Sequence, residues 1–250
     1  MFRHLEELSR NAWPGSRVVE FDGWVLQFAG GYTRRANSVN LAGTSIIAVE
    51  DKVQVCEDAY RLEDQPTIFK IFPDPETEAL DVYLEARGYR SEGHAYVMTQ
   101  AIEPMELTDS CHVQVETELT DWWLDAAVQL NQISGTNRLH LANILRNINP
   151  TQAFASIRHE NEPVAVGLGV LDNGWCGLYD IVTSERHRRL GHGKVLVQSM
   201  IEWARQQGAH HAYLQVMTQN HPAQQLYRSL GFEQEYEYWY RVSPPTISEV

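Results

Sequence analysis

A basic, glycine-containing segment in the second half of the chain offers the clearest chemistry. Residues 183–194 hold four of the 20 Lys and Arg residues of the sequence and two of its 10 histidines. Gly191 and Gly193 stand directly before an apolar stripe at helical spacing. The first N–H groups of a helix lack an intrahelical partner and lie at the positive end of its dipole, so this turn can bind a phosphate or diphosphate. The basic side chains that would neutralise such an anion are Arg188, Arg189 and Lys194.

Short glycine motifs beside arginines also occur in ordinary solvated turns, and the segment alone leaves that alternative open. Two nucleotide-binding loops do not fit it. The segment has no Gly-Lys-Ser/Thr, as a phosphate-binding NTPase loop requires, and no third glycine to complete G-x-G-x-x-G.

The segment resembles a signature of a known family, the GNAT superfamily of N-acetyltransferases. The Arg/Gln-x-x-Gly-x-Gly/Ala motif of that family has its counterpart at residues 188–193, and a second family motif follows in the same order as in the family. Two spaced motifs in the right order are more specific than either alone. The resemblance covers about residues 112–242. The residues that carry it are Arg188-Arg189-Leu190-Gly191-His192-Gly193, Leu214-Gln215-Val216, Asn220, Ala223, Leu226-Tyr227 and Leu230-Gly231-Phe232.

The resemblance implies that acetyl-CoA is the cosubstrate and assigns roles to residues of this chain. Tyr227 would protonate the departing CoA thiolate, and Asn220 would bond the pantetheine arm. Main-chain groups of a strand ending at Thr183 would pair with that arm like an added β-strand. The residues implied to bind acetyl-CoA are Ile181, Val182, Thr183, Arg188, Arg189, Leu190, Gly191, His192, Gly193, Lys194 and Asn220.

Ordinary structural roles remain open for two of these residues. Tyr227 can pack against Phe232 as a helix tyrosine. Asn220 can cap the helix that carries Pro222 in its first turn. The sequence does not choose between these roles and the functional ones.

The general base is the least specified part of the implied mechanism. The attacking amine must be neutral, so its protonated form first loses a proton. In the related bacterial ribosomal-protein acetyltransferases a glutamate in the Leu-x-Val strand is the base, but this chain has Gln215 there, which cannot accept the proton. Asp180 on the preceding strand is our leading candidate for the base. A solvated or hydrogen-bonded strand carboxylate without a catalytic role is at least an equal interpretation of this residue. Glu116, Glu118 and a chain of waters are more distant alternatives.

Alternating strands and helices must position these residues. The predicted fold class is α/β (α+β), with a mixed, mostly antiparallel central sheet flanked by helices, as in the GNAT fold. Gly167 and Gly169 within one predicted strand favour a bulge or a close backbone approach there. Strands are predicted over 153–158, 163–171, 175–183, 212–216 and 236–240, and helices from Thr120, over 139–148, from about Gly193, and over 222–229.

A polar, proline-containing stretch near residues 103–110 predicts a linker between two tandem domains. The predicted domains are 1–105, which is GNAT-like but degenerate, and 112–243, which is catalytic. Residues 244–250 form a tail.

The first domain is identified by a weak internal repeat. Residues 81–89 resemble residues 224–232, at an offset of 143. Leu84 stands where the second copy has Tyr227, and residues 41–46 replace the glycine motif. We therefore expect this domain to serve packing or to form one wall of the acceptor cleft. Residues 34–40 are polar enough to line that cleft, or they form an ordinary hairpin strand.

Composition excludes several other functions. The formal net charge of -13 argues against a nucleic-acid partner, and the sequence lacks the run of about 18 apolar residues that a membrane span requires. The acidic start, Glu6-Glu7, does not resemble a secretory signal, so we expect a cytoplasmic location. Cys56, Cys111 and Cys176 are odd in number and unpaired by spacing, so neither disulfides nor a metal site is expected.

The predicted function is transfer of an acetyl group from acetyl-CoA to a primary amine, either a small molecule or a peptide. The alternative is a GNAT-like module that senses acyl-CoA or binds a partner without catalysis. An acidic protein suits a cationic amine acceptor, but the sequence specifies neither that acceptor, nor the acyl group beyond acetyl, nor the oligomeric state.

Overall fold

The computed structural model describes residues 1–104 and 113–245. The contacts of the chain divide it into two units, the first made of Met1–Tyr96 with the residues from Tyr236 onward, the second of Val97–Glu235. Most of the predicted linker, together with Cys111 and the end of the predicted tail, lies outside the described residues. The domain boundaries at 105 and 112 remain predictions.

Mostly antiparallel strands form the sheet of the second unit, in the spatial order β10-β9-β8-β7-β6. β10 and β9 are parallel, whereas β8 is antiparallel to both β9 and β7, and β7 to β6. The end of β5 (Arg90–Ala101) lies beside β10, and the start of β11 (Glu233–Val242) follows it. The remaining strands are β6 (Val113–Glu116), β7 (Thr151–His159), β8 (Glu162–Asp172), β9 (Trp175–Thr183) and β10 (His211–Met217).

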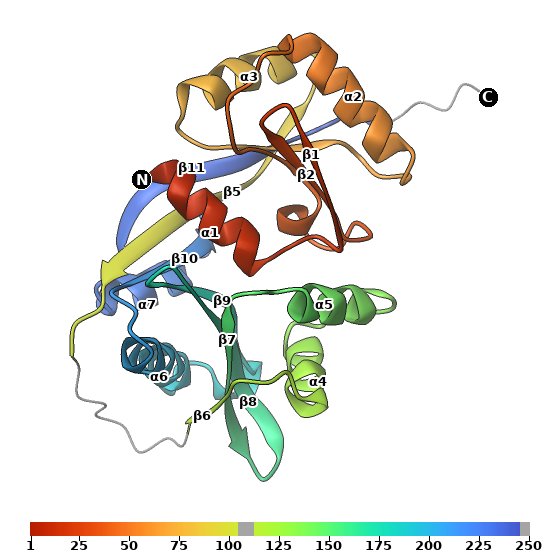
Figure 1. Ribbon diagram of the computed structural model, residues 1–250. Coiled ribbons are helices and arrows are strands. Elements are labelled where there is room, and N and C mark those ends of the chain that lie inside the picture. The colour runs from red at the N-terminus through yellow and green to blue at the C-terminus, as the bar shows by residue number, and fades with distance from the viewer. Residues whose placement is uncertain (105–112, 246–250) are drawn as a thin grey trace. The chain divides into compact units, whose positions relative to one another are not determined.

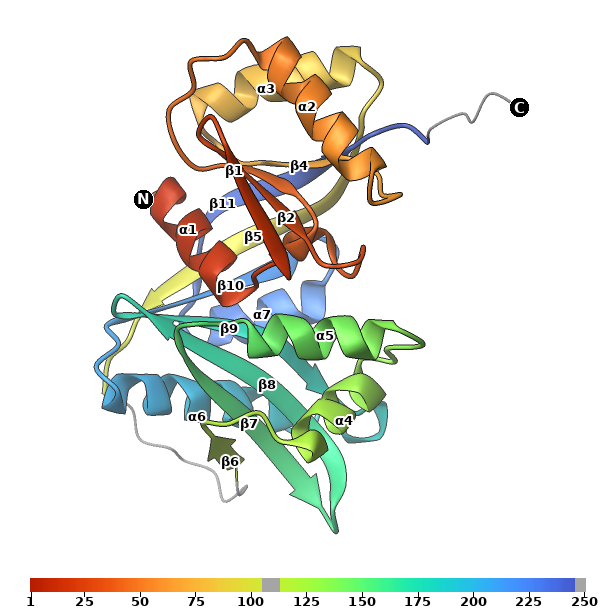
Figure 2. The ribbon, with the colours of Figure 1, turned by 45° about the vertical axis from the view of Figure 1, so that its right-hand side comes forward.

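Helices cover both faces of this sheet, α6 and α7 on one side and α4 and α5 on the other (Figures 1 and 2). Thr120 caps α4 by accepting a hydrogen bond from the N–H of Trp123 at 3.2 Å. The predicted apolar stripe of α6 is fully buried at Leu196, Met200 and Ala204. The predicted fold class, a mixed and mostly antiparallel sheet flanked by helices, is therefore confirmed. The helices are α4 (Asp121–Leu130), α5 (Asn137–Arg146), α6 (His192–Gln206) and α7 (His221–Ser229).

Glycine in β8 lets α6 approach the sheet closely. A Cβ atom added at Gly167 would lie 2.9 Å from Sδ of Met200 and 3.2 Å from Cδ2 of Leu196, both on α6. At Gly169 the nearest atom would be 3.6 Å away, an ordinary contact. A bulge or a close backbone approach was predicted for this strand, and Gly167 has both, since the register with β9 also shifts between Val166 and Leu168.

The first unit repeats the order of elements found in the second. Its strands β1, β2 and β3 precede a helix, a strand, a helix and a strand, as β7, β8 and β9 do. The spatial order of its strands is β1-β2-β3-β4-β11-β5. The elements are α1 (Phe2–Ala12), β1 (Arg17–Phe21), β2 (Trp24–Phe28), a 3₁₀ turn (Arg34–Ala36), β3 (Val39–Leu41), α2 (Val49–Arg61), β4 (Ile68–Ile71) and α3 (Pro75–Ala86).

The two helix ends that suggested the repeat share the same hydrogen bond. The N–H of Tyr89 donates to the carbonyl of Leu84 at 3.1 Å, and that of Phe232 to the carbonyl of Tyr227 at 3.0 Å. The glycine before each aromatic residue has a positive φ, +82° and +94° respectively. Both helices thus end in a left-handed glycine cap.

The last strand of the chain completes the sheet of the first unit. β11 pairs with β4 in antiparallel register, from Trp239↔Ile71 to Val242↔Ile68. Nε of Arg241, a buried side chain, donates to Asp81 on α3 at 2.7 Å.

No helix in the described ranges is both long and apolar enough to cross a membrane.

We expect Gly167→Ala to lower the free energy of unfolding by about 1 kcal/mol, because Met200 and Leu196 must move to admit the methyl group. Gly169→Ala is the matched control on the same strand and should leave stability unchanged or slightly higher. Urea denaturation measures both. Equal effects of the two substitutions would contradict the close approach of α6.

Candidate functional site

The sheet of the second unit opens between its two parallel strands. Paired residues run from His211↔Trp175 to Leu214↔Leu178. Beyond them β9 continues to Thr183 and β10 to Met217. The predicted pantetheine-binding residues, Ile181, Val182 and Thr183, all lie on this last part of β9. Their backbone groups therefore stand along an opened sheet edge, which an extended ligand can join as a strand would.

A β-bulge bends β9 where this opening begins. On β8, Leu168 pairs with Tyr179 and Val166 pairs with Val182. Two residues of β9, Asp180 and Ile181, therefore lie opposite one residue of β8, Gly167. Asp180 has a φ of +47°, a conformation that non-glycine residues seldom adopt. Because a bulge bends its strand and increases its twist, it gives a local reason for β9 to turn away from β10.

A pair of tyrosines joins the two strands just before they separate. The hydroxyl of Tyr179 donates to that of Tyr213 at 2.8 Å, and both side chains are buried. Gly177 makes room for them, since a Cβ atom there would lie 2.6 Å from the ring of Tyr213. This pair was not predicted from the sequence. Its signal is Gly177, a glycine without an evident role in a mostly apolar strand, but the ring of Tyr213 that requires this glycine lies on another strand.

The basic segment forms a loop that leads from β9 into α6. The N–H of Ser184 donates to Val164 at 2.8 Å, which ties the start of the loop to β8. Hydrogen bonding of the helix begins with the N–H groups of Lys194 and Val195, which both donate to Gly191. The N–H groups at the start of α6 therefore have the orientation and dipole environment that bind an anion.

The two glycines of the loop lie in different local surroundings. Gly191 is the N-cap of α6 and has a φ of +87°, with open space where a Cβ atom would be. At Gly193 a Cβ atom would lie 3.4 Å from Leu226 on α7 and 3.5 Å from Oγ1 of Thr183, which are ordinary contacts. The first glycine is therefore required by its conformation, whereas local packing does not require the second.

The predicted loop residues lie together around this turn and are exposed to different degrees. Arg188, Arg189 and Lys194 are exposed, and Leu190 is 64% exposed. Arg189 has a positive φ of +65°. The first turn of α6 contains no acidic residue. Positive charge therefore surrounds the start of the helix.

Tyr227 lies on α7 and is buried, with 7% of its surface exposed. Its ring meets that of Phe232 edge to face at a centroid distance of 6.0 Å, so the packing role is present. Burial raises the pKa of its hydroxyl to about 12. The hydroxyl thus carries its proton at neutral pH, as a general acid must.

Asn220 is the N-cap of α7. Its Oδ1 accepts a hydrogen bond from the N–H of Ala223 at 3.3 Å, and Pro222 follows in the first turn. The capping role is therefore present. The cap uses the amide oxygen, and a bond from Asn220 to the CoA arm remains a prediction.

The carboxylates considered as general bases lie in different places. Asp180 is partly buried at the bulge, beside the opening. Glu116 lies on β6, three strands away from β9 and so about 14 Å at 4.8 Å per strand. It also accepts a hydrogen bond from Thr120 at 3.3 Å and lies 3.7 Å from Arg158. Gln215 is on β10, directly after the paired residues. Asp180 is therefore better placed than Glu116.

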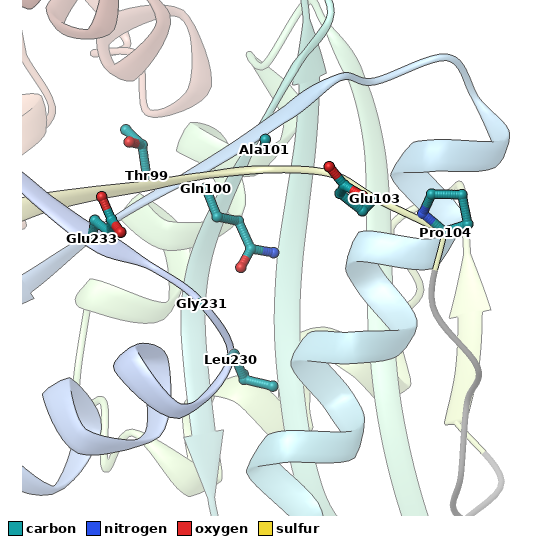
Figure 3. A pocket seen from close by; sticks show the side chains of 8 residues that line it. All are labelled: Thr99, Gln100, Ala101, Glu103, Pro104, Leu230, Gly231 and Glu233. Carbon is teal, nitrogen blue, oxygen red and sulfur yellow. The ribbon is translucent and has the colours of Figure 1, made fainter.

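A pocket of about 500 Å³ lies elsewhere in the second unit (Figure 3). The strand ends of β5 and β11 and the turn after α7 enclose it, and none of the predicted site residues lines it. The side chain of Gln100 extends toward Gly231 in this pocket (Figure 3). The lining residues are Thr99, Gln100, Ala101, Glu103, Pro104, Leu230, Gly231 and Glu233.

The cysteines in the described part of the chain are buried free thiols, Cys56 and Cys176. Burial raises the pKa of each to about 12, so neither is a reactive thiolate at neutral pH. Among the residues that the structure covers, no three His, Cys, Asp or Glu side chains converge as metal ligands.

A protein family and a relative from Bacillus subtilis match nearly the whole length of this chain in sequence. A protein family described as "Probable histone acetyltransferase Rv0428c C-terminal" matches residues 1–241. The uncharacterized N-acetyltransferase YobR of Bacillus subtilis is 29% identical over 245 residues, which span 96% of this chain and 98% of that protein.

Solved structures are similar over much of the chain. A GCN5-related N-acetyltransferase from Kribbella flavida has a TM-score of 0.68 at 17% identity and covers 97% of this chain and 95% of its own. A tandem GNAT protein from the clavulanic acid biosynthesis pathway has a TM-score of 0.61 at 12% identity, over 84% of this chain and 76% of its own. At these identities the structures establish the fold.

A mostly antiparallel sheet, opened between two parallel strands beside a glycine loop and helix, is the arrangement of a GNAT N-acetyltransferase. The resemblance seen in the sequence is thereby confirmed. With its match over residues 1–241, the chain belongs to the Rv0428c C-terminal acetyltransferase family.

Proposed function

We propose that the chain transfers an acetyl group from acetyl-CoA to a primary amine by direct attack of the amine on the thioester. The observation that carries this proposal is the basic glycine loop at the start of α6, next to the opening between β9 and β10. The loop offers backbone N–H groups to the diphosphate of the cosubstrate, and the opened edge of β9 offers hydrogen bonds to its pantetheine arm.

The chemical step needs a base, an oxyanion donor and an acid. Asp180 receives the proton of the amine, directly or through water, and the neutral amine attacks the thioester carbonyl. Backbone N–H groups at the bulge of β9 stabilise the oxyanion that forms. Tyr227 donates its proton to the CoA thiolate as the thiolate leaves. The second proton, which the nitrogen loses as the amide forms, passes through water and restores the tyrosine hydroxyl.

The acceptor is a primary amine of a small molecule or a peptide. A lysine side chain of a basic protein belongs in any test panel, because the description of the matching family names a histone acetyltransferase and the net charge of -13 attracts cations. A cytoplasmic location is part of the same proposal and is compatible with the buried free thiols.

An acyl-CoA sensor without catalysis is the competing function. A thermal-shift and turnover panel with acetyl-CoA and assorted amines separates the two. Transfer to at least one amine supports the enzyme, whereas stabilisation by acetyl-CoA with no transfer to any amine supports the sensor.

Gly191→Ala should weaken acetyl-CoA binding at least tenfold, about 1.4 kcal/mol, because the backbone can no longer hold its left-handed turn around the diphosphate. Gly208→Ala is the matched control. Gly208 ends α6 with a φ of +90° and the same open space, but it lies at the opposite end of the helix. Isothermal titration calorimetry measures binding, and equal losses in the two variants would count against the loop.

Tyr227→Phe should lower kcat about 100-fold while changing the Kd for acetyl-CoA less than twofold, since it removes the acidic proton and keeps the ring. Release of the CoA thiol reports turnover. Phe232→Leu is the control: it keeps the hydroxyl but loses the ring contact, and should lower stability more than turnover. Unchanged turnover in Tyr227→Phe would remove this residue from the mechanism.

Asp180→Asn should lower kcat/KM about tenfold or more at pH 7, and the defect should shrink as the pH approaches the pKa of the amine, because neutral amine then forms without a base. Asparagine tolerates the φ of +47° at this position. Glu116→Gln should have no such effect. A pH-independent defect would identify Asp180 as a structural residue.

A further inference from the structure

The loop before α2 in the first unit corresponds in element order to the basic loop before α6. One joins β3 to α2, and the other joins β9 to α6. In the first unit a side chain of the protein already lies against this loop. The carboxylate of Asp22 accepts hydrogen bonds from the N–H of Ile46, at 3.1 Å, and from that of Ile47, at 3.0 Å.

A buried lysine completes the surroundings of this carboxylate. Nζ of Lys52, in the first part of α2, lies 3.2 Å from Oδ2 of Asp22, and only 1% of the lysine side chain is exposed. The same ammonium group lies 4.0 Å from the ring centre of Trp24 and also donates to Ser45. The hydrogen bond from Ile47, with that from Ile46 and the charge of Lys52, lowers the pKa of Asp22 below its ordinary value. At neutral pH the Asp22 carboxylate therefore carries a full negative charge.

The hairpin turn that carries Asp22 closes directly onto the loop. The N–H groups of Ala42 and Gly43 donate to the carbonyl of Gly23 at 2.9 and 2.8 Å. A Cβ atom at Gly23 would lie only 2.4 Å from the carbonyl oxygen of Thr44. The turn and the loop thus touch through their backbones, which leaves no space between them for a second anion.

The charges around the two helix starts also differ. The first turn of α2 contains Glu50 and Asp51, whereas the first turn of α6 contains no acidic residue. Acidic residues there suit the dipole of α2 but repel an approaching diphosphate. The chain itself therefore supplies the acceptor for the Ile46 and Ile47 N–H groups of this loop.

We propose that Asp22 is a built-in anion that fills, in the first unit, the seat that the diphosphate of acyl-CoA takes in the second. Each chain consequently binds one acyl-CoA, at the loop before α6. This inference rests on the proposed function of that loop. It makes the first unit a domain that cannot take the cofactor, for a reason that its own residues supply.

Calorimetric titration of the full chain with acetyl-CoA tests the stoichiometry. We expect one site per wild-type chain, and we expect Gly191→Ala to weaken all binding at least tenfold. Two sites in the wild type, or one site that keeps wild-type affinity in Gly191→Ala, would overturn the inference and leave acetyl-CoA binding itself intact. Absence of binding to the wild type would instead refute the proposed function, and the one-site inference with it.

Anion rescue tests the seat without any cofactor. Asp22→Gly empties it, and glycine accepts the φ of +44° at this turn position. Sodium sulfate and sodium formate, each compared with sodium chloride at equal ionic strength, should raise the Tm of this variant more than that of the wild type. Asp64→Gly is the matched control, because Asp64 also has a positive φ, +54°, in an exposed turn of the same unit.

Equal shifts of Tm in Asp22→Gly, Asp64→Gly and the wild type would show that the seat holds no anion and would overturn the proposal. If Asp22→Gly does not fold, Asp22→Asn tests the charge instead, since it keeps the shape of the side chain and fills the same space. It should lower the Tm more than Asp64→Asn does, and equal losses in the two variants would overturn the proposal.

Discussion

Backbone N–H groups in a loop that leads into a helix need an acceptor, and the two units of this chain differ in what surrounds such groups. In the first unit Asp22 supplies a carboxylate to the loop before α2, with Lys52 beside it. In the second unit the loop before α6 is basic and exposed, and its first intrahelical bonds begin only at Lys194 and Val195. One fold can thus provide either a closed structural turn or an exposed basic loop, depending on a few residues near one turn.

The opening of the sheet follows from equally local causes. The pairing of β9 with β10 ends at Leu178↔Leu214, beside the buried hydrogen bond between Tyr179 and Tyr213. The bulge at Asp180 then bends β9. Glycine is essential on both faces of this region, because Gly177 admits the tyrosine rings and Gly167 admits α6. The rigid part of the sheet therefore sets the place where its edge becomes available to a ligand.

Local sequence patterns were sufficient for the fold class, the helices and the glycine loop. The helix predicted over 222–229 begins at His221, and the helix predicted from Gly193 begins at His192, because caps and apolar stripes are encoded within a few residues. A bulge or close approach was predicted at Gly167, and the irregular pairing of β8 with β9 lies at that glycine. The positive φ of Asp180 opposite it and the acceptor of the Ile46 and Ile47 N–H groups were not predicted. Each depends on residues that are distant in sequence, such as Asp22 and Ile47, and a single sequence does not report such contacts.

The course of the last strand has a consequence for how the protein is made. β4 finds its antiparallel neighbour in residues 239–242, and Arg241 bonds to Asp81 from that strand. During synthesis the ribosome therefore releases most of the first unit long before the strand that borders β4 exists. Until then Ile68–Ile71 presents an unpaired edge of apolar character, which invites wrong pairing between nascent chains. The amino-terminal unit of this polypeptide therefore cannot complete its sheet until residues 239–242 have been made.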